Sequence, residues 1–253
     1  MVAAIHLMRL LWRTSDDESR PTSGPKRRLT VDEVVDAAIA IADERGDVSM
    51  RAVADRLGVT PMALYGYLPN KEMLLALMYD AIHADVLDPS RFDGHWRGAV
   101  IACAEELLDL YVAHPWSLQV SYARPVLGPN EQGMLERLVG LFRQTPIPPN
   151  LLRRALGMLL HAVRGTARTI AEAQEAARST GRSEDEWWEE VSEAVSVVVP
   201  DFAERFPNTL WLFSAQDAGE EQPGSYVDRH SRENLRVGLE LLLDGLEAAA
   251  SRS

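Results

Sequence analysis

The segment 49–68, which reads SMRAVADRLGVTPMALYGYL, constrains the fold of this chain more than any other. Val53 and Leu57 lie one helical turn apart, so the first half of the segment has one apolar face. Ala54 is small enough to let a second helix approach, and Gly58 permits the backbone conformation that a tight turn needs. This pattern predicts a helix-turn-helix, a motif whose second helix enters the major groove of double-stranded DNA.

Capping signals predict further helices on both sides of this segment. Thr30 has the chemistry of a helix N-cap, and Glu33 three residues later completes a capping box. Gly46 is expected to end this helix. Another helix is expected over 70–86, because its apolar residues recur with helical spacing. Together these signals predict a small helical DNA-binding domain over residues 29–75.

The rest of the chain has the pattern of packed helices, with no convincing strand and no internal repeat. Apolar residues recur at helical spacing, and prolines or polar stretches separate them. Helices are expected at 95–113, 116–123, 130–144, 149–178, 184–199 and 229–249. The sequence therefore predicts an all-α fold, in which a larger helical domain over residues 76–253 follows the DNA-binding domain.

Residues 1–28 are expected to form a flexible N-terminal arm. Residues 14–28 contain two prolines, a glycine and many polar side chains, which is typical of a linker. Residues 1–14 are apolar, but they lack the basic, apolar and small-residue order of a signal peptide. They are interpreted as a short arm or an amphipathic turn, with Met8 as an alternative start of the chain.

The charge of the chain is unevenly distributed. The formal net charge is −12, yet residues 1–71 hold ten Lys/Arg and ten Asp/Glu. Residues 72–253 hold 16 basic and 28 acidic residues, so they carry the whole excess. A DNA-binding protein needs positive charge only where it contacts phosphates. The acidic part of this chain is therefore expected to face away from DNA.

The helix-turn-helix and its flanks resemble the DNA-binding domain of the tetracycline-repressor (TetR) family of regulators. The matching positions are Gly46, Ser49-Met50-Arg51, Ala54, Leu57-Gly58-Val59, Leu64-Tyr65 and Asn70-Lys71. The resemblance covers residues 29–86, and the remainder is similar to the family in being all-helical and of similar length. Gly66 stands where a bulkier residue is common, and Tyr67 replaces a frequent His. These departures bear on sequence preference rather than on DNA binding.

The resemblance implies roles in DNA binding for individual side chains. Arg51 stands where the family often places an arginine that reads a guanine edge. Tyr65 and Tyr67 are expected to donate their hydroxyls to phosphates, and Lys71 is expected to hold a phosphate at a helix start. The candidate DNA-contacting residues are Arg28, Ser49, Arg51, Thr60, Pro61, Met62, Tyr65, Tyr67 and Lys71.

Two of these assignments have alternatives. Tyr65 could instead be a core aromatic residue that stabilises the small helical domain. The basic cluster 26–28 could be part of a solvated linker rather than a contact to phosphate or to the minor groove.

One helix-turn-helix makes few contacts, so tight binding is expected from a homodimer that reads two half-sites. The segments 149–178 and 229–249 carry more apolar positions than one core face requires. In the TetR family two such helices from each subunit form a four-helix bundle, and the same bundle is implied here. The alternative is that both helices belong only to the core.

The resemblance also implies a small-molecule effector bound among the middle helices. Binding cavities are mostly apolar with a few polar groups. His161 and Arg164 share one face of an otherwise apolar helix, and a buried Arg needs a partner. The candidate ligand-binding residues are His83, Trp116, Gln119, Tyr122, His161, Arg164 and Trp187. Each of them could instead be an ordinary core or surface residue.

Several function classes find no support in the sequence. There is no phosphate loop, no metal-ligand spacing and no nucleophile elbow, so an enzyme, a metal and a cofactor are not expected. No apolar run is long enough for a membrane span, and the single Cys103 fits the reducing cytoplasm. The sequence thus predicts a cytoplasmic, ligand-responsive dimeric repressor of operator DNA. The alternative is an architectural DNA-binding protein without an effector.

Overall fold

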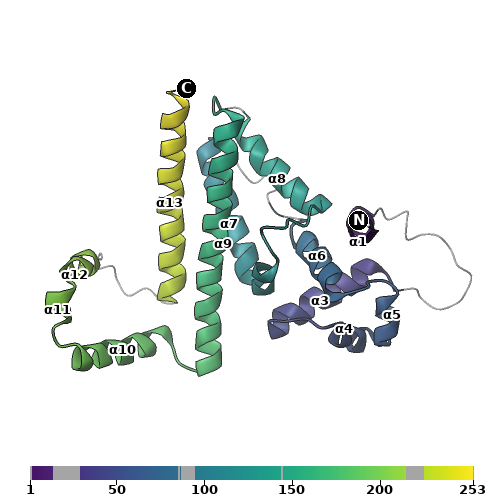
Figure 1. The fold of residues 1–253 in the computed structure, drawn as a ribbon, viewed down its shortest axis with the longest axis horizontal. Coiled ribbons are helices and arrows are strands. Elements are labelled where there is room, and N and C mark those ends of the chain that lie inside the picture. The colour runs from purple at the N-terminus through teal and green to yellow at the C-terminus, as the bar shows by residue number, and fades with distance from the viewer. Residues whose placement is uncertain are drawn as a thin grey trace, which may run out of the picture. The chain divides into compact units, whose positions relative to one another are not determined.

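The computed structural model describes residues 2–13, 29–84, 86, 95–143, 145–214 and 225–252. Every regular element in these ranges is a helix, as the sequence predicts (Figure 1). The elements are α1 (Val2–Leu11), α3 (Val31–Arg45), α4 (Met50–Leu57), α5 (Pro61–Tyr65), α6 (Lys71–Ile82), α7 (Trp96–Ala113), the 3-10 helix η2 (Pro115–Gln119), α8 (Pro129–Phe142), α9 (Pro149–Thr180), α10 (Glu184–Val198), α11 (Phe202–Arg205), α12 (Pro207–Ser214) and α13 (Tyr226–Ala250). No helix in the described ranges is long and apolar enough to cross a membrane.

The chain forms two compact units. The first unit comprises Met1–Arg168 and Arg236–Ser253, and the second comprises Thr169–Leu235. The boundary falls inside α9 and α13, so each of these helices contributes to both units. No unit boundary lies near residue 75, and the functional domains 29–75 and 76–253 stay a prediction.

The helix-turn-helix is built as its sequence predicts. Within the first unit α3 packs against both α4 and α6, and α4 packs against α5 (Figure 1). Thr30 and Glu33 form both hydrogen bonds of the capping box at the start of α3. Gly58 follows α4 with φ of 67° and ψ of 29°, a left-handed conformation that favours glycine. This turn lets α5 begin three residues later, at Pro61, without strain in the backbone.

Helix α6 is shorter than the expected 70–86. It ends at Ile82, and the next backbone N–H, that of His83, donates to Asp80 O at 3.0 Å in a tighter turn. The ring Nδ1 of His83 lies 2.7 Å from the carbonyl oxygen of Tyr79. The His83 side chain therefore satisfies a carbonyl at the end of the helix that no further helical turn reaches.

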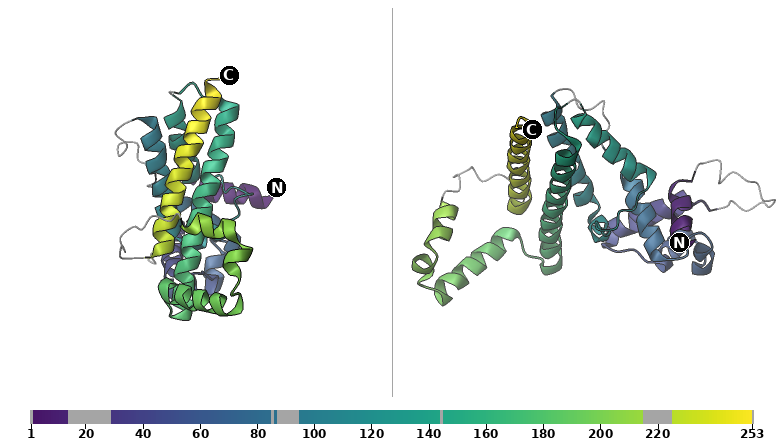
Figure 2. Two further views of the ribbon diagram at one scale, coloured as in Figure 1. Left: turned by 90° about the vertical axis from the view of Figure 1, so that its left-hand side faces the viewer. Right: turned by 45° about the horizontal axis from the view of Figure 1, so that its top comes forward.

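The N-terminal segment is not a flexible arm throughout, which corrects the prediction for residues 1–28. Residues Val2–Leu11 form α1, which packs beside α6 at the edge of the first unit (Figure 2). Leu11 is buried, and the indole N–H of Trp12 donates to Leu127 O at 2.9 Å. The tertiary contact decides the outcome, because an isolated ten-residue helix is marginal in water. The linker 14–28 lies outside the described residues.

The body of the first unit surrounds an aliphatic core. Helix α8 packs against both α6 and α7. The fully buried side chains of this core include Leu107, Leu108, Leu138 and Leu159. At one edge the guanidinium of Arg97 in α7 pairs with Asp244 and Glu247 in α13. The expected helix 116–123 is instead the five-residue 3-10 helix η2, since Pro115 starts it and Val120 is already extended.

The second unit has little core of its own. Helices α10, α11 and α12 contain no buried residue in the described part of the chain. The two short helices α11 and α12 were not expected from the sequence, because four and eight residues give too short a periodic pattern. Phe202 and Phe206 pack their rings 4.9 Å apart at this corner.

Candidate nucleic-acid interface and candidate ligand residues

The second helix of the helix-turn-helix presents its outer face to solvent. Thr60 caps α5, since its Oγ1 accepts the backbone N–H of Ala63 at 3.3 Å. Met62 and Tyr65 are 79% and 46% exposed, while Leu64 and Leu68 are fully buried. The exposure of Tyr65 excludes the alternative that it is a core aromatic residue. Its hydroxyl and the Met62 thioether are available to a groove or to phosphates.

The start of α4 adds a second exposed edge. Ser49 caps this helix by accepting the backbone N–H of Ala52 at 3.2 Å. Arg51 follows in the first turn, is exposed, and forms no hydrogen bond or ion pair with the described residues. Arg56 at the other end of α4 pairs with Glu44 at 2.8 Å. Of these two arginines in α4, Arg51 is the one whose guanidinium is uncommitted.

Lys71 is the first residue of α6. This is the position expected for a lysine that holds a phosphate at a helix start. In the DNA-free chain its Nζ lies 2.7 Å from Oδ1 of Asp47. This hydrogen bond lowers the pKa of Asp47 below its ordinary value. A phosphate that bound Lys71 would have to displace Asp47, and no local pattern in the sequence indicates this pairing.

Replacing Asp47 by Asn is expected to strengthen DNA binding up to about fivefold. The change removes a negative charge beside Lys71, and an exposed ion pair of this type is worth about 0–1 kcal/mol. The measurement is fluorescence anisotropy on a labelled DNA duplex at fixed salt. The variant Glu136→Gln, which removes an equal charge from an exposed residue of α8, is the control. Weaker binding by Asp47→Asn would show that Asp47 positions Lys71 rather than competing for it.

The remaining DNA candidates are placed as follows. Pro61 is exposed at the first position of α5, and Tyr67 is half-buried just after that helix. Gly66 has an ordinary right-handed conformation, with φ of −70° and ψ of −26°. Arg28 lies outside the described residues. The structure thus brings the candidates from Ser49 to Lys71 together in one small set of helices.

Two ligand candidates, His83 and Arg164, form one hydrogen-bonded chain with Tyr79 and Tyr111 in the first unit. His83 Nε2 lies 3.3 Å from the Tyr111 hydroxyl, and the Tyr79 and Tyr111 hydroxyls are 3.4 Å apart. A guanidinium N–H of Arg164 donates to the Tyr79 hydroxyl at 3.5 Å. Burial lowers the pKa of His83 to about 4 and raises that of Tyr79. His83 is therefore neutral at pH 7, and the Nδ1 proton points to the Tyr79 carbonyl.

Arg164 is the polar centre of this cluster. Its guanidinium also donates to the backbone oxygens of Leu118 at 3.4 Å and Val120 at 3.1 Å. It lies over the rings of Tyr111 and Tyr122, 5.3 and 5.4 Å from their centroids, within cation–π range. Carbonyls and aromatic faces satisfy this cation without a carboxylate, so it could still receive an anionic or carbonyl group from a ligand.

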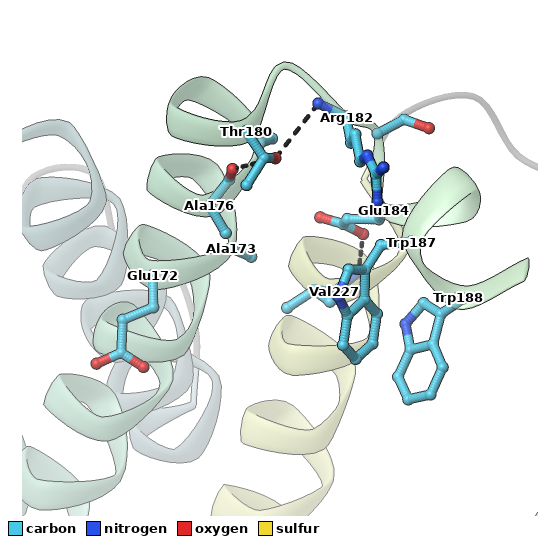
Figure 3. A pocket seen from close by; sticks show the side chains of 11 residues that line it. Glu172, Ala173, Ala176, Thr180, Arg182, Glu184, Trp187, Trp188 and Val227 are labelled. Atoms are coloured by element: carbon cyan, nitrogen blue, oxygen red, sulfur yellow. Dashed lines mark hydrogen bonds between the residues drawn. The ribbon is translucent and has the colours of Figure 1, made fainter. Parts of the chain in front are cut away.

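The other ligand candidates have different surroundings. Tyr122 and His161 are exposed, and their rings meet edge to face 4.9 Å apart. Gln119 is exposed as well. Trp116 is buried, and its indole N–H donates to Asp43 Oδ1 of α3 at 2.8 Å. Trp187 belongs to the second unit, where it lines a separate pocket (Figure 3).

Two carboxylates, the exposed Asp43 and the buried Asp80, join helices of the first unit, and neither was predicted from the sequence. Asp43 in α3 accepts from Trp116 Nε1 and lies 2.8 Å from His114 Nδ1. Asp80 in α6 accepts the backbone N–H groups of Asn130 at 3.0 Å and Glu131 at 2.9 Å. Burial raises the pKa of Asp80, and these N–H donors counteract that rise. A lone carboxylate in the apolar run of α6 was the available signal.

Asp43 and Asp80 tie the DNA-binding helices to the body of the first unit. Asp43 fastens α3 to η2, and Asp80 caps the positive N-terminal end of α8 from α6. Charge-assisted hydrogen bonds thus join η2 to α3 and α8 to α6.

Comparisons with known proteins agree with this arrangement. Residues 34–78 match the family model for bacterial regulatory proteins of the tetR family, and residues 88–250 match the model for the tetracyclin repressor-like C-terminal domain. The chain is 38% identical over 248 residues to the HTH-type transcriptional repressor DrrR1 of Streptomyces coeruleorubidus, covering 97% of this chain and 86% of that protein.

Solved structures give the same fold. Apo ActR from Streptomyces coelicolor aligns with a TM-score of 0.68 at 24% identity, over 90% of this chain and 99% of that one. ActR in complex with actinorhodin aligns with a TM-score of 0.65 at 24% identity, over 88% and 99%. These neighbours confirm the predicted all-α fold, in which a larger helical domain follows an N-terminal helix-turn-helix domain.

Proposed function

Because this chain belongs to the TetR family of DNA-binding transcriptional regulators, we propose that it is a homodimeric repressor released from its operator by a small molecule. The proposal names a direction of regulation, an oligomeric state and a control by ligand. DrrR1 is named as a transcriptional repressor, which supports repression by this chain, and the complex of ActR with actinorhodin supports control by a ligand.

The exposed face of α5 carries the proposal for DNA. Met62 and Tyr65 point to solvent from a helix that Leu64 anchors in the core. Met62 and Tyr65 are three residues apart on this helix, and adjacent exposed apolar side chains of this kind can mark an interaction site. The major groove accepts a helix of this width, and thymine methyl groups and phosphates suit these two side chains. Arg51 adds the guanidinium that can read a guanine edge.

Exposed apolar side chains of α9 and α13 support a homodimer. Met158 is 64% exposed in α9, and Val237 and Leu241 are 45% and 68% exposed in α13. All three belong to the first unit and lie on helices whose opposite faces carry buried residues. A second copy of the same helices would cover them in a four-helix bundle with twofold symmetry.

The cluster around Arg164 supports the effector site. It offers a guanidinium, three tyrosine hydroxyls and the neutral His83, mostly on helices tied to the DNA-binding helices. A ligand that moved η2 would act on α3 through Asp43. A ligand that moved α6 would act on the DNA-binding helices directly. To release DNA, it must bind the displaced state more tightly than the DNA-bound state.

The proposal is tested by selecting binding sites for the full chain from fragmented genomic DNA. We expect an enriched inverted repeat whose half-sites are about one or more helical turns apart. The variant Leu241→Glu should then run as a monomer in sedimentation and lose the operator, because it buries a charge in the bundle. Enrichment without any repeat, or a Leu241→Glu variant that stays dimeric, would contradict the proposal.

A further inference from the structure

The end of α1 is anchored to the first unit by three consecutive residues. Leu11 is only 3% exposed, in a helix that packs against α6 (Figure 1). The indole N–H of Trp12 donates to Leu127 O at 2.9 Å. The guanidinium of Arg13 pairs with Asp32 in the first turn of α3. These three residues, called the clamp below, connect α1 and its neighbour α6 to α3 and to the chain just before α8.

The Trp12 contact holds Leu127 in a conformation that leucine rarely adopts. Leu127 has a φ of 60°, in the left-handed region that is unfavourable for a residue with a Cβ. Its N–H donates to Glu131 Oε2 at 2.7 Å, and its carbonyl oxygen accepts from Trp12. The next residue, Gly128, lies directly against Asp80 of α6. Trp12 therefore stabilises the backbone at the point where α6 and α8 meet.

Arg13 connects the same junction to the start of α3. Its side chain is 18% exposed, although its partner Asp32 is 68% exposed. Burial raises the pKa of Asp80, and hydrogen bonds from Asn130 and Glu131 together with the positive charge of Arg13 oppose that rise. One guanidinium thus acts both on the first turn of α3 and on the carboxylate that caps α8.

The helices that the clamp connects are among the DNA-binding helices. Helix α3 packs against α4, which carries Arg51, and α6 begins with Lys71. Helix α6 also carries Asp80, which accepts the backbone N–H of Glu131 in α8. Because α1 packs against α6 and is bonded to the chain before α8, a rearrangement that separated α6 from α8 would break one of these contacts. The clamp therefore opposes such a rearrangement.

We propose that Trp12 and Arg13 are positioning residues, which hold α3 and α6 in the arrangement that binds the operator and so oppose its release. This inference rests on the proposed function in one respect, namely that the ligand-free chain is the form that binds DNA. The observed operator affinity falls with the fraction of the chain that is in the binding-competent state. Loss of a clamp contact should therefore weaken operator binding without removing any group that touches DNA.

The first test needs no DNA. Trp12→Phe keeps an aromatic ring and removes the indole N–H that bonds to Leu127. Hydrogen–deuterium exchange of the full-length protein, read by mass spectrometry, should be about fivefold faster over residues 127–134, because losing a hydrogen bond makes local opening easier. Ile5→Ala, at the exposed start of α1, is the control and should leave this exchange unchanged. Equal exchange in Trp12→Phe and the parent chain would contradict the proposal.

The second test uses the pair of Arg13 and Asp32, with affinity for the selected operator measured by fluorescence anisotropy at fixed salt. Asp32→Asn removes a negative charge, which by itself favours DNA binding, yet we expect about threefold weaker binding because Arg13 loses its partner. Asp36→Asn removes an equal charge from an exposed position one turn later and should not weaken binding. The opposite signs expected for these two variants distinguish the clamp from a general effect of charge.

Variants of the arginine complete the test. Arg13→Ala should weaken operator binding about threefold, and Arg13→Lys, which can still pair with Asp32, should restore it. Arg9→Ala removes an exposed arginine one turn earlier in α1 and should leave the affinity unchanged. The double variant Arg13→Ala/Asp32→Asn should bind no more weakly than Arg13→Ala alone, because both changes break one contact.

Three results in the binding assay would overturn the proposal. They are tighter binding by Asp32→Asn, equal losses in Arg9→Ala and Arg13→Ala, and additive losses in the double variant. If no operator can be selected, the proposed function is contradicted instead, whereas the exchange over residues 127–134 still decides whether Trp12 holds the junction of α6 and α8.

Discussion

Replacing Gly128 by Ala will lower the free energy of unfolding by about 3 kcal/mol, a larger loss than we expect at any other glycine that the structure describes. Gly128 is the N-cap of α8 and is buried against Asp80. A Cβ at this position would stand 2.8 Å from Oδ2 of Asp80 and closer still to Oδ1, which is well inside van der Waals contact.

The loss follows from what Asp80 must give up when it moves. Its carboxylate accepts three N–H groups, those of the Asn130 backbone, the Glu131 backbone and the Asn130 side chain at 3.1 Å. Hydrogen bonds to a charged group are worth about 1.5–3 kcal/mol each, so losing part of this set outweighs the gain of one buried methyl. The backbone of Gly128 itself is not strained, since its φ is −78°.

Urea denaturation followed by circular dichroism measures this effect. Gly140→Ala in the same helix is the control, because a Cβ there meets nothing within 4 Å. It should leave stability unchanged or raise it by up to about 1 kcal/mol, as expected for Gly to Ala in a helix interior. Equal behaviour of the two variants would show that Asp80 can move aside without cost.

Replacing Arg51 by Ala will weaken binding to the selected operator about 5- to 150-fold. A bidentate contact between an arginine and guanine contributes about 1–3 kcal/mol of discrimination. Arg51 is exposed and forms no ion pair within the described residues, so the variant should unfold at the same urea concentration as the parent chain.

Two comparisons separate base reading from a general charge effect. Arg178→Ala removes another exposed arginine, from α9, and should leave operator affinity unchanged. Binding of Arg51→Ala to unrelated DNA should fall far less than its binding to the operator, because a base contact acts only on the right sequence. An equal loss on both DNAs would assign Arg51 to phosphate instead.

The positions of the DNA-binding helices could be predicted from the sequence because their ends depend on local interactions. The capping box at Thr30 and the left-handed Gly58 depend on a few neighbouring residues, and the structure has both as expected. Of the DNA candidates, the exposed Met62 and Tyr65 lie on a short helix whose Leu64 is fully buried. The end of α6 was placed four residues too late, because the bond from His83 to Tyr79 is not visible in an apolar pattern.

Candidate ligand residues were harder to predict than helices. His83, Tyr122, His161 and Arg164 do fall in one neighbourhood, but Trp116 is bound to Asp43 and Trp187 lies in the other unit. Spacing along a helix says which side chains share a face, yet it does not say which helix that face meets.

The sequence by itself determined that the chain is all-helical, where the helix-turn-helix lies and to which family it belongs, because periodicity, caps and turn residues are local properties. Only the tertiary structure decided that residues 2–11 form a docked helix, that Asp47 holds Lys71, and that Asp43 and Asp80 fasten the DNA-binding helices. Each of these contacts joins residues at least 19 positions apart and depends on packing that brings them within hydrogen-bond distance. A sequence pattern records which side chains are available, whereas their free energy of interaction depends on that distance and on burial.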